Sequence, residues 1–130
     1  MRPFFDTNTL VYAVSADPRG HRARELLDGG GTVSVQVLNE LTNVLLRKLR
    51  RSWPEIEAVM DDLAPLLSPP VPLTLATHQA ARWLARDHGF GFYDALILAA
   101  AIEAGCDTLF SEDLQDGRRL GGLRIVSPFA

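Results

Sequence analysis

Lysine, cysteine and long apolar runs are scarce in this chain, and each scarcity excludes a class of protein. Lys48 is the only lysine among 13 basic residues and lies in a predicted helix, which removes most mechanisms that need a lysine, including P-loop phosphate binding and Schiff-base chemistry. Cys106 is the only cysteine, so no disulfide can form within the chain and a cytoplasmic location is expected. The longest apolar stretch, Ala95 to Ile102, is far shorter than the ~20 residues of a membrane span, and the first residues do not resemble a signal peptide.

Length and charge indicate one domain that is compatible with a nucleic-acid partner. A chain of 130 residues without a linker-like stretch or an internal repeat is expected to form a single domain, residues 1–130, and to bury roughly two-thirds of its unfolded surface. The net charge is −3, but it becomes +1 once four candidate site acids (Asp6, Glu40, Asp94 and Asp113) are set aside. The overall acidity therefore does not exclude RNA.

Short apolar segments alternate with amphipathic segments along the chain. The former predict β-strands, and the latter repeat apolar residues at helical spacing. This alternation predicts an α/β fold in which helices cover a parallel sheet, with right-handed crossovers and with ligands beyond the carboxyl ends of the strands. Residues 7–9 are expected to cap a helix that follows the first strand. The expected strands are residues 3–5, 32–35, 71–74, 108–110 and 123–126, and the expected helices include residues 21–28, 36–51 and 92–104.

Asp6, Glu40, Asp94 and Asp113 are the candidate functional residues. Asp6 and Asp113 each follow an expected strand, so both are predicted at the carboxyl edge of the sheet. Glu40 falls at the margin of the apolar stripe of its helix, and Asp94 lies in the first turn of an almost wholly apolar helix. Like charges packed together raise one another's pKa and oppose folding, so the cluster predicts a neutralising Mg²⁺ or Mn²⁺ ion.

Each of these acids also has an ordinary explanation when it is taken alone. A turn, a helix dipole or an exposed helix surface would account for each of them singly. The combination favours a site, because Glu40 and Asp94 lie in or beside apolar faces, where an unpaired charge costs several kcal/mol. Two further acids, Glu112 and Asp116, are expected to face solvent, the second in a turn with Gly117.

Several motifs spread along essentially the whole chain together resemble those of one protein family. They are FFDTNTLVYA at Asp6, NEL at Glu40, FYDALILAAA at Asp94, and LFSEDLQDG followed by GLRIVSPF at Asp113. In this order they resemble a PIN-domain ribonuclease and, within that family, the VapC-like toxins of toxin–antitoxin pairs. Asn8 belongs to the Asp-Thr-Asn start of the family. The resemblance implies a PIN-like three-layer α/β/α fold with a five-stranded parallel sheet of order 3-2-1-4-5, and RNA cleavage with Mg²⁺ or Mn²⁺.

The resemblance also implies roles and partners. Asp6, Asp94 and Asp113 would hold the ion, while Glu40 would bind a second ion or orient the attacking water. Ser111 stands at the family's hydroxyl position and would position a water or donate to phosphate, although a strand-end turn explains it equally well. Relatives are typically homodimers that also bind an antitoxin, so a second copy and a cognate antitoxin protein are expected beside the RNA substrate.

A basic run, Arg47, Lys48, Arg50 and Arg51, ends the helix that carries Glu40. Either the favourable interaction of basic residues with a helix C-terminus or contact with RNA phosphates explains this run. No aromatic residue interleaves with these charges, and both explanations stay open. The RNA target stays open as well, because surface loops and RNA shape determine it.

Other functions of a parallel α/β fold fit the sequence less well. A response-regulator receiver needs a lysine near its last strand, where this chain has none. A haloacid-dehalogenase-like phosphatase needs a second aspartate two residues after Asp6, where this chain has Asn8. A non-catalytic PIN-like module that binds RNA or protein is the remaining alternative, but such a module gives no reason to keep clustered negative charge.

Overall fold

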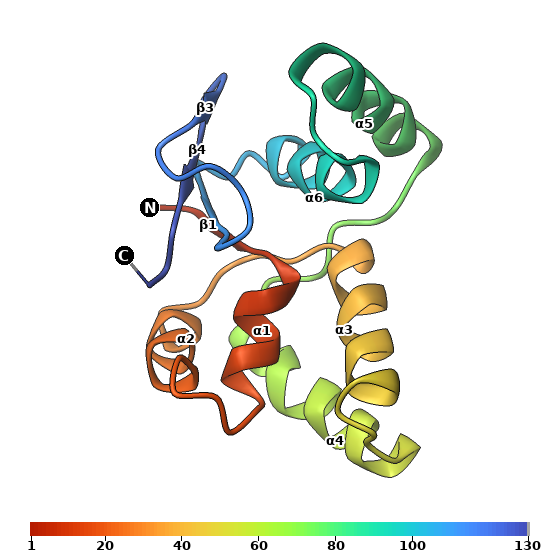
Figure 1. Ribbon diagram of the computed structural model, residues 1–130, viewed down its shortest axis with the longest axis vertical. Helices are drawn as coiled ribbons and strands as arrows, with labels where there is room; N and C mark the ends of the chain where they lie inside the picture. Colours follow the sequence, from red (N-terminus) through yellow and green to blue (C-terminus); the bar gives the residue numbers. More distant parts are fainter. Residues whose placement is uncertain (130) are drawn as a thin grey trace.

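The computed structural model describes residues 1–129, and its small sheet lies at one side of the molecule, with helices to its right and below it in Figure 1. The strands are short, and the helices carry most of the chain. The strands are β1 (Pro3–Phe5), β2 (Thr108–Phe110), β3 (Arg119–Leu120) and β4 (Leu123–Val126). The helices are α1 (Thr7–Ala13), α2 (Gly20–Asp28), α3 (Val35–Arg47), α4 (Trp53–Leu63), α5 (Leu75–His88) and α6 (Phe92–Glu103), with a 3-10 turn, η1, at Ala64–Leu66.

The sheet has the order β1-β2-β4-β3 and is parallel over its first three strands. Phe4 of β1 pairs with Leu109 of β2, which in turn pairs with Ile125 of β4. All three side chains are fully buried. The predicted α/β fold with a parallel sheet is therefore confirmed, and the carboxyl ends of β1, β2 and β4 lie at one edge.

The predicted count of five parallel strands is wrong. Four strands form among the described residues, and β3 runs antiparallel to β4. The expected strands 32–35 and 71–74 make isolated parallel bridges instead, which join Phe4 to Thr32 and Ser34 to Val71. The prolines at 69, 70 and 72 lack the N–H that would extend such a ladder, and Ser34 already caps α3. The segments still lie side by side in the expected order, with residue 71 beside 34, residue 32 beside β1, and then β2 and β4.

The hairpin between β3 and β4 is an element that the sequence-based expectation lacks. Leu120 pairs with Leu123, so Gly121 and Gly122 form a two-residue loop between them. Gly121 has a φ of 59°, the left-handed conformation that such tight turns require. A Gly-Gly pair between two leucines is the sequence signal for this hairpin.

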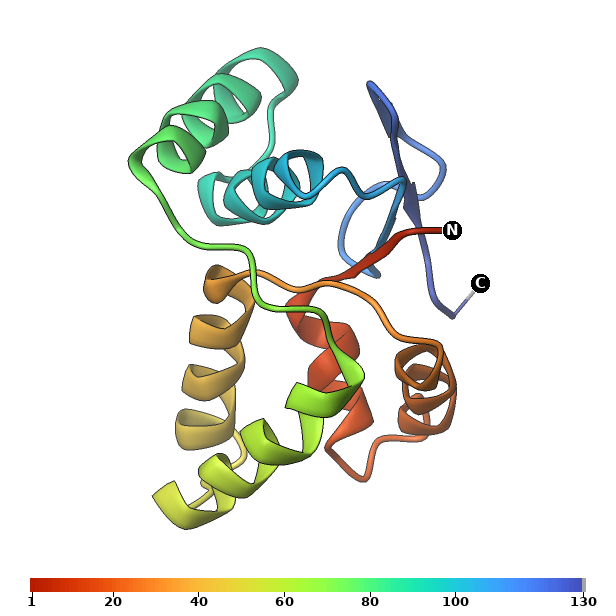
Figure 2. The same cartoon turned by 180° about the vertical axis from the view of Figure 1, so that it is seen from behind.

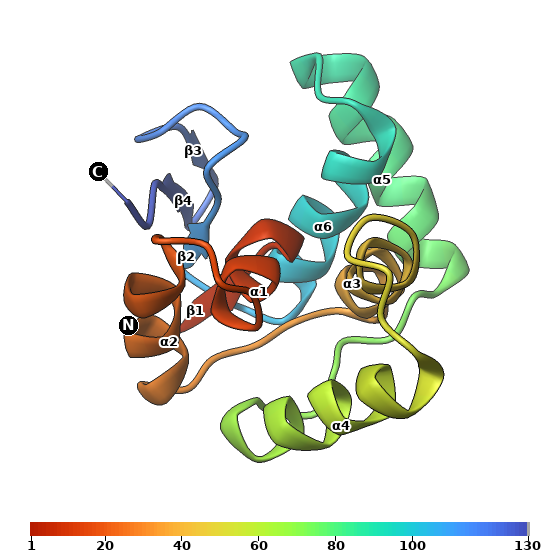
Figure 3. The ribbon, with the colours of Figure 1, turned by 60° about the horizontal axis from the view of Figure 1, so that its bottom comes forward.

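The helix α6 is central to the fold, and residues 95–101 in it are buried without a break. Its nearly uniform apolar sequence predicts this position. The helix α5 packs along α6, whereas α1 packs between α2 and α3 (Figure 3). The helix α4 crosses behind α1 and α3 in Figure 1 and comes to the front in Figure 2. Although α6 is apolar, no helix of residues 1–129 is long and apolar enough to cross a membrane.

The helix α3 is shorter than predicted and ends at Arg47 rather than at residue 51. Arg50 has a φ of 53°, a left-handed conformation that terminates a helix. The Arg51 N–H then donates to the Leu45 carbonyl at 2.8 Å, which folds the chain back over the helix end. Part of the basic run is therefore in the connection to α4 and not in the helix.

Gly31 lies where the chain passes close to β1, and this close approach leaves no room for a side chain. A Cβ at this position would overlap the Phe5 ring and stand 3.1 Å from the Pro3 carbonyl oxygen. Because Phe5 is fully buried, its ring has no free space to move into. Gly31→Ala is therefore expected to lower the free energy of unfolding by about 1–3 kcal/mol, the usual range for overpacking, in urea denaturation.

Gly122→Ala is the matched control for this prediction, since no atom lies within 4 Å of its Cβ position. It should leave stability almost unchanged. An equal loss of stability in both variants would contradict the packing role of Gly31.

Candidate active site

Asp6 lies at the junction between β1 and α1 and is buried, with 6% of its surface exposed. It is the N-cap of α1, in place of residues 7–9, and its Oδ1 accepts from the Thr9 N–H at 3.2 Å and the Thr9 hydroxyl at 3.1 Å. The Ser111 hydroxyl also donates to this carboxylate. Burial raises the pKa of Asp6 to about 6, the charge of Asp113 adds to the rise, and the hydrogen bonds oppose it. Asp6 is therefore an oriented carboxylate whose charge is not neutralised.

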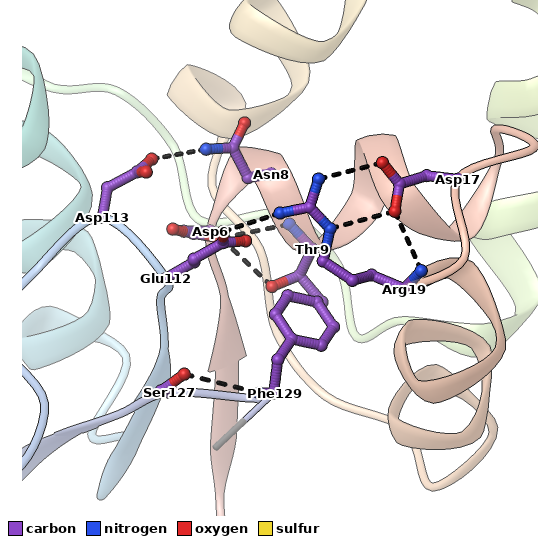
Figure 4. Close-up of polar contacts among 9 residues, drawn as sticks. All are labelled: Asp6, Asn8, Thr9, Asp17, Arg19, Glu112, Asp113, Ser127 and Phe129. Atoms are coloured by element: carbon purple, nitrogen blue, oxygen red, sulfur yellow. Dashed lines mark hydrogen bonds and ion pairs between the residues drawn. The ribbon is translucent and has the colours of Figure 1, made fainter.

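The end of β2 places Ser111 and Asp113 beside Asp6, as adjacent parallel strands require. The Asp6 N–H donates to the Phe110 carbonyl at 3.2 Å, which holds the two strand ends together. Ser111 is buried, with 1% exposed, and its oxygen accepts from the N–H three residues later, which closes a turn. Asp113 is exposed and accepts a hydrogen bond from the Asn8 side-chain amide (Figure 4).

Glu40 extends from α3 toward α1 and is held through both of its carboxylate oxygens. Its Oε1 accepts from the Thr7 hydroxyl at 3.0 Å, and its Oε2 accepts from the Gln36 side-chain amide at 2.9 Å. Gln36 lies one helical turn earlier, on the same face of α3. Both donors are neutral, so they fix the direction of the carboxylate without cancelling its charge.

Asp94 lies in the first turn of α6 and completes the group of acids. Its side chain is exposed, yet partial loss of water raises its pKa, and the charges of Asp113 and Glu40 raise it further. The charge of Asp113 also raises the pKa of Asp6. The structure thus brings Asp94 within range of the charges of Glu40 and Asp113, and Asp113 within range of Asp6.

The four acids have no basic partner. Within residues 1–129, none of them takes part in an ion pair, and no group of three or more His, Cys, Asp or Glu side chains is arranged to hold a metal ion. The available donors are carboxylate oxygens, which Mg²⁺ and Mn²⁺ prefer, and Mg²⁺ usually keeps several waters and takes only one or two carboxylates directly. The donor set fits such a hydrated hard cation and does not fit a closed protein cage.

Glu112 is exposed, as predicted, but its carboxylate is held by neighbouring side chains. It accepts from Arg19 at 2.7 Å and from the Tyr12 hydroxyl. Burial and Glu112 raise the pKa of Tyr12 to about 12, so its hydroxyl keeps the proton that it donates. Asp116 is exposed, as predicted, and in addition it accepts from the Ser127 N–H at 2.7 Å.

The basic run lies toward the C-terminal end of α3, beyond the acids. Arg47 follows Glu40 by two helical turns, about 10 Å along the axis. Arg51 forms an ion pair with Glu55 at 3.7 Å, and all four basic side chains are exposed. Contact between this run and RNA stays a prediction.

The sequence model of the PIN domain matches residues 4–120 of the chain. The chain belongs to the PIN-domain family. The matched region contains all four acids and every helix of the structure described here. No match was found among curated proteins.

Three solved structures resemble this PIN domain. VapC20 of Mycobacterium tuberculosis, named as a sarcin–ricin loop cleaving toxin, has a TM-score of 0.68 and 23% identity over 85% of this chain and 91% of that chain. A toxin–antitoxin complex from Klebsiella pneumoniae has a TM-score of 0.74 and 19% identity over 97% of each chain. VapBC2 from Rickettsia felis, bound to a DNA fragment from its promoter, has a TM-score of 0.68 and 21% identity over 98% of each chain. At these identities the likeness establishes the fold.

Sequence reasoning missed the neutral residues that hold the acids of this PIN domain. The contact from Gln36 to Glu40 could have been predicted from the sequence, because residues four apart in a helix lie on the same face. The contact from Thr9 to Asp6 was also predictable, because an N-cap side chain accepts from the N–H three residues after it. Thr7 bonds Glu40 across 33 residues of sequence, and no local spacing marks such a pair.

The raised pKa of Asp6 makes the stability of the metal-free PIN domain depend on pH. The folded protein holds the Asp6 proton up to about pH 6, whereas an ordinary aspartate releases it near 3.8. Folding therefore binds a proton between these values, so stability falls as pH rises through this window and is level above it. Asp6→Asn removes the titrating group, and at neutral pH it should be more stable than the wild type by on the order of 3 kcal/mol.

Urea denaturation of the metal-free protein between about pH 4 and pH 7.5 measures this difference. Asp62→Asn, which changes an exposed acid on α4, is the control and should follow the wild type. A difference between wild type and Asp6→Asn that stays constant across this range would contradict the assignment.

Proposed function

We propose that this chain is a Mg²⁺- or Mn²⁺-dependent endoribonuclease and the toxin of a VapBC-type toxin–antitoxin pair. The observation that carries the proposal is the group of four carboxylates without a basic partner at the carboxyl edge of a PIN-domain sheet. Clustered charge of this kind is unfavourable in a folded protein unless a cation binds. Its presence at an open edge supports metal-assisted hydrolysis of phosphodiester bonds.

Each acid has a defined part in this proposal. Asp6, Asp94 and Asp113 would hold the ion directly or through water, and Glu40 would complete the ligand set or orient the attacking water. When bound, the ion would polarise the scissile phosphate and lower the pKa of the attacking water. Ser111 would act by holding Asp6, because its buried hydroxyl already donates to that carboxylate.

The open side of the site suits single-stranded RNA. Asp94 and Asp113 are exposed, and Tyr93 beside Asp94 has 66% of its surface exposed. Exposed aromatic rings stack the unpaired bases of single strands. One structural neighbour is named as a sarcin–ricin loop cleaving toxin, which supports RNA as the substrate class.

A cognate antitoxin is the proposed protein partner. Two of the structural neighbours are toxin–antitoxin structures, one of them bound to promoter DNA. We extend this association to the present chain, together with a homodimeric state. A cytoplasmic location is proposed as well, since the single cysteine is buried and free.

The purified protein is expected to cleave single-stranded RNA in Mg²⁺ or Mn²⁺ and to lose this activity in EDTA. Asp6→Asn and Asp94→Asn should each lower the cleavage rate by about 100-fold or more, because each removes a proposed ligand of the shared ion. Gel analysis of an end-labelled RNA measures the rate. Glu57→Gln, which changes an exposed acid on α4, is the control and should cleave at the wild-type rate.

Thermal melting provides an independent readout of the same ion. For the wild type, millimolar Mn²⁺ should raise the melting midpoint above that in EDTA. Asp94→Asn removes one of the clustered negative charges, so it should raise the midpoint in EDTA and reduce the increase that Mn²⁺ causes. Equal midpoints for the wild type under both conditions would contradict a metal site. A metal-stabilised protein without cleavage would favour the non-catalytic PIN-like module.

Expression of the protein without its partner is expected to arrest growth. Asp6→Ala and Glu40→Gln should each relieve the arrest, because removal of one ligand disables the shared site. Co-expression of the short protein encoded beside it should also relieve it. Arrest that persists with an inactive nuclease would separate toxicity from RNA cleavage and contradict the toxin mechanism.

A further inference from the structure

Arg19 contacts three side chains, one of them Glu112 next to Asp113, although it has no part in the proposed chemistry. Its Nε and Nη2 donate to the two carboxylate oxygens of Asp17, each at 2.9 Å. Its Nη1 donates to Glu112 Oε1 at 2.7 Å, and its guanidinium carbon lies 4.0 Å from the centre of the Tyr12 ring. Figure 4 shows Arg19 between Asp17 and Glu112, so it joins the segment before α2 to the loop after β2.

Glu112 is flanked in that loop by two residues of the site. Ser111, before it, donates to Asp6, and Asp113, after it, accepts from Asn8. Three consecutive side chains are thus tied to different points on or beside α1. The direction of the Asp113 carboxylate depends on this backbone segment, so a contact that fixes Glu112 also fixes Asp113.

Stability alone does not account for these contacts. The side chains of Arg19 and Glu112 are 43% and 33% exposed, and ion pairs at such positions contribute little to the free energy of unfolding. The distinctive feature is that the guanidinium of Arg19 is held in place before it meets Glu112. Asp17 holds the guanidinium fork through two bonds and Tyr12 covers one face of it, so Arg19 loses little rotamer freedom when it meets Glu112.

We propose that Arg19 and Glu112 are positioning residues of the metal site: their ion pair holds the loop at residues 111–114 so that Asp113 faces the acids with which it shares a cation. The inference rests on the proposed nuclease function. Arg19 is already engaged by Asp17 and Glu112, so an RNA phosphate would have to displace one of these two carboxylates to bind it.

Titration of the full-length protein with Mn²⁺, followed by the electron paramagnetic resonance signal of the free ion, tests this inference. Arg19→Gln and Glu112→Gln should each weaken Mn²⁺ binding about tenfold, the scale seen when a residue that orients a metal ligand is removed. The double variant should bind no more weakly than either single variant, because both substitutions break the same pair. At saturating Mn²⁺, RNA cleavage should return close to the wild-type rate.

Arg86→Gln is the matched control. Arg86 forms an equally short ion pair with Asp87 at 2.7 Å, in an exposed part of α5, and its loss should leave Mn²⁺ affinity unchanged. Glu112→Gln keeps the shape of the side chain, so it decides the matter alone if Arg19→Gln does not fold.

The possible results separate this inference from the proposed function. A wild-type protein that binds no Mn²⁺ would overturn the proposed function. Wild-type binding with unchanged affinity in Glu112→Gln would overturn the positioning role alone. A raised KM for RNA in Arg19→Gln at unchanged Mn²⁺ affinity would show that Arg19 meets RNA directly, and this too would overturn the inference.

Discussion

The buried carboxylate of Asp6 is the constraint on which the rest of the site depends. It lies where β1 ends and α1 begins, so both elements hold it: the Asp6 N–H donates to the Phe110 carbonyl of β2, and the Asp6 carboxylate accepts from the Thr9 N–H of α1. A slip of one residue between β1 and β2 would turn Asp6 and Ser111 to opposite faces of their strands. The parallel pairing of two short strands therefore makes one site out of residues from opposite ends of the chain.

The polar groups around the acids orient them without cancelling their charge. All of the donors are neutral, so none of them cancels the charge of an acid, while burial keeps the pKa values of Asp6 and Asp94 raised. The nearby guanidinium of Arg19 is directed to other carboxylates. The neutral donors are the hydroxyls of Thr7, Thr9 and Ser111 and the amides of Asn8 and Gln36.

The scaffold depends on burial more than on particular residues. The three structural neighbours keep the fold with TM-scores from 0.68 to 0.74 at identities of 19% to 23%. The helix α6 is buried through most of its length, and the chain at Gly31 packs closely against β1. Many apolar sequences satisfy such a pattern, so the fold does not define the activity by itself, and the proposed function is argued from the acids and the groups that orient them.

Local signals in the sequence determined the fold class, the four acids and several helices. The predicted helix 21–28 is observed as Gly20–Asp28, and the predicted helix 92–104 as Phe92–Glu103. Both were predictable because the spacing of apolar residues indicates a helix whatever element it packs against. Asp6 and Asp113 were also predictable at the carboxyl edge, because both follow short apolar segments that form strands.

Tertiary structure alone decided the extent of the sheet and the partners of the acids. Residues 32–35 and 71–74 have strand-like sequences, but ladder formation depends on the N–H groups of the neighbouring segment, and prolines remove several of these. The bond from Thr7 to Glu40 and the ion pair from Arg19 to Glu112 join residues that only the packing of α1, α3 and the loop after β2 brings together. No local pattern marks such pairs, because each side chain by itself is equally satisfied by water.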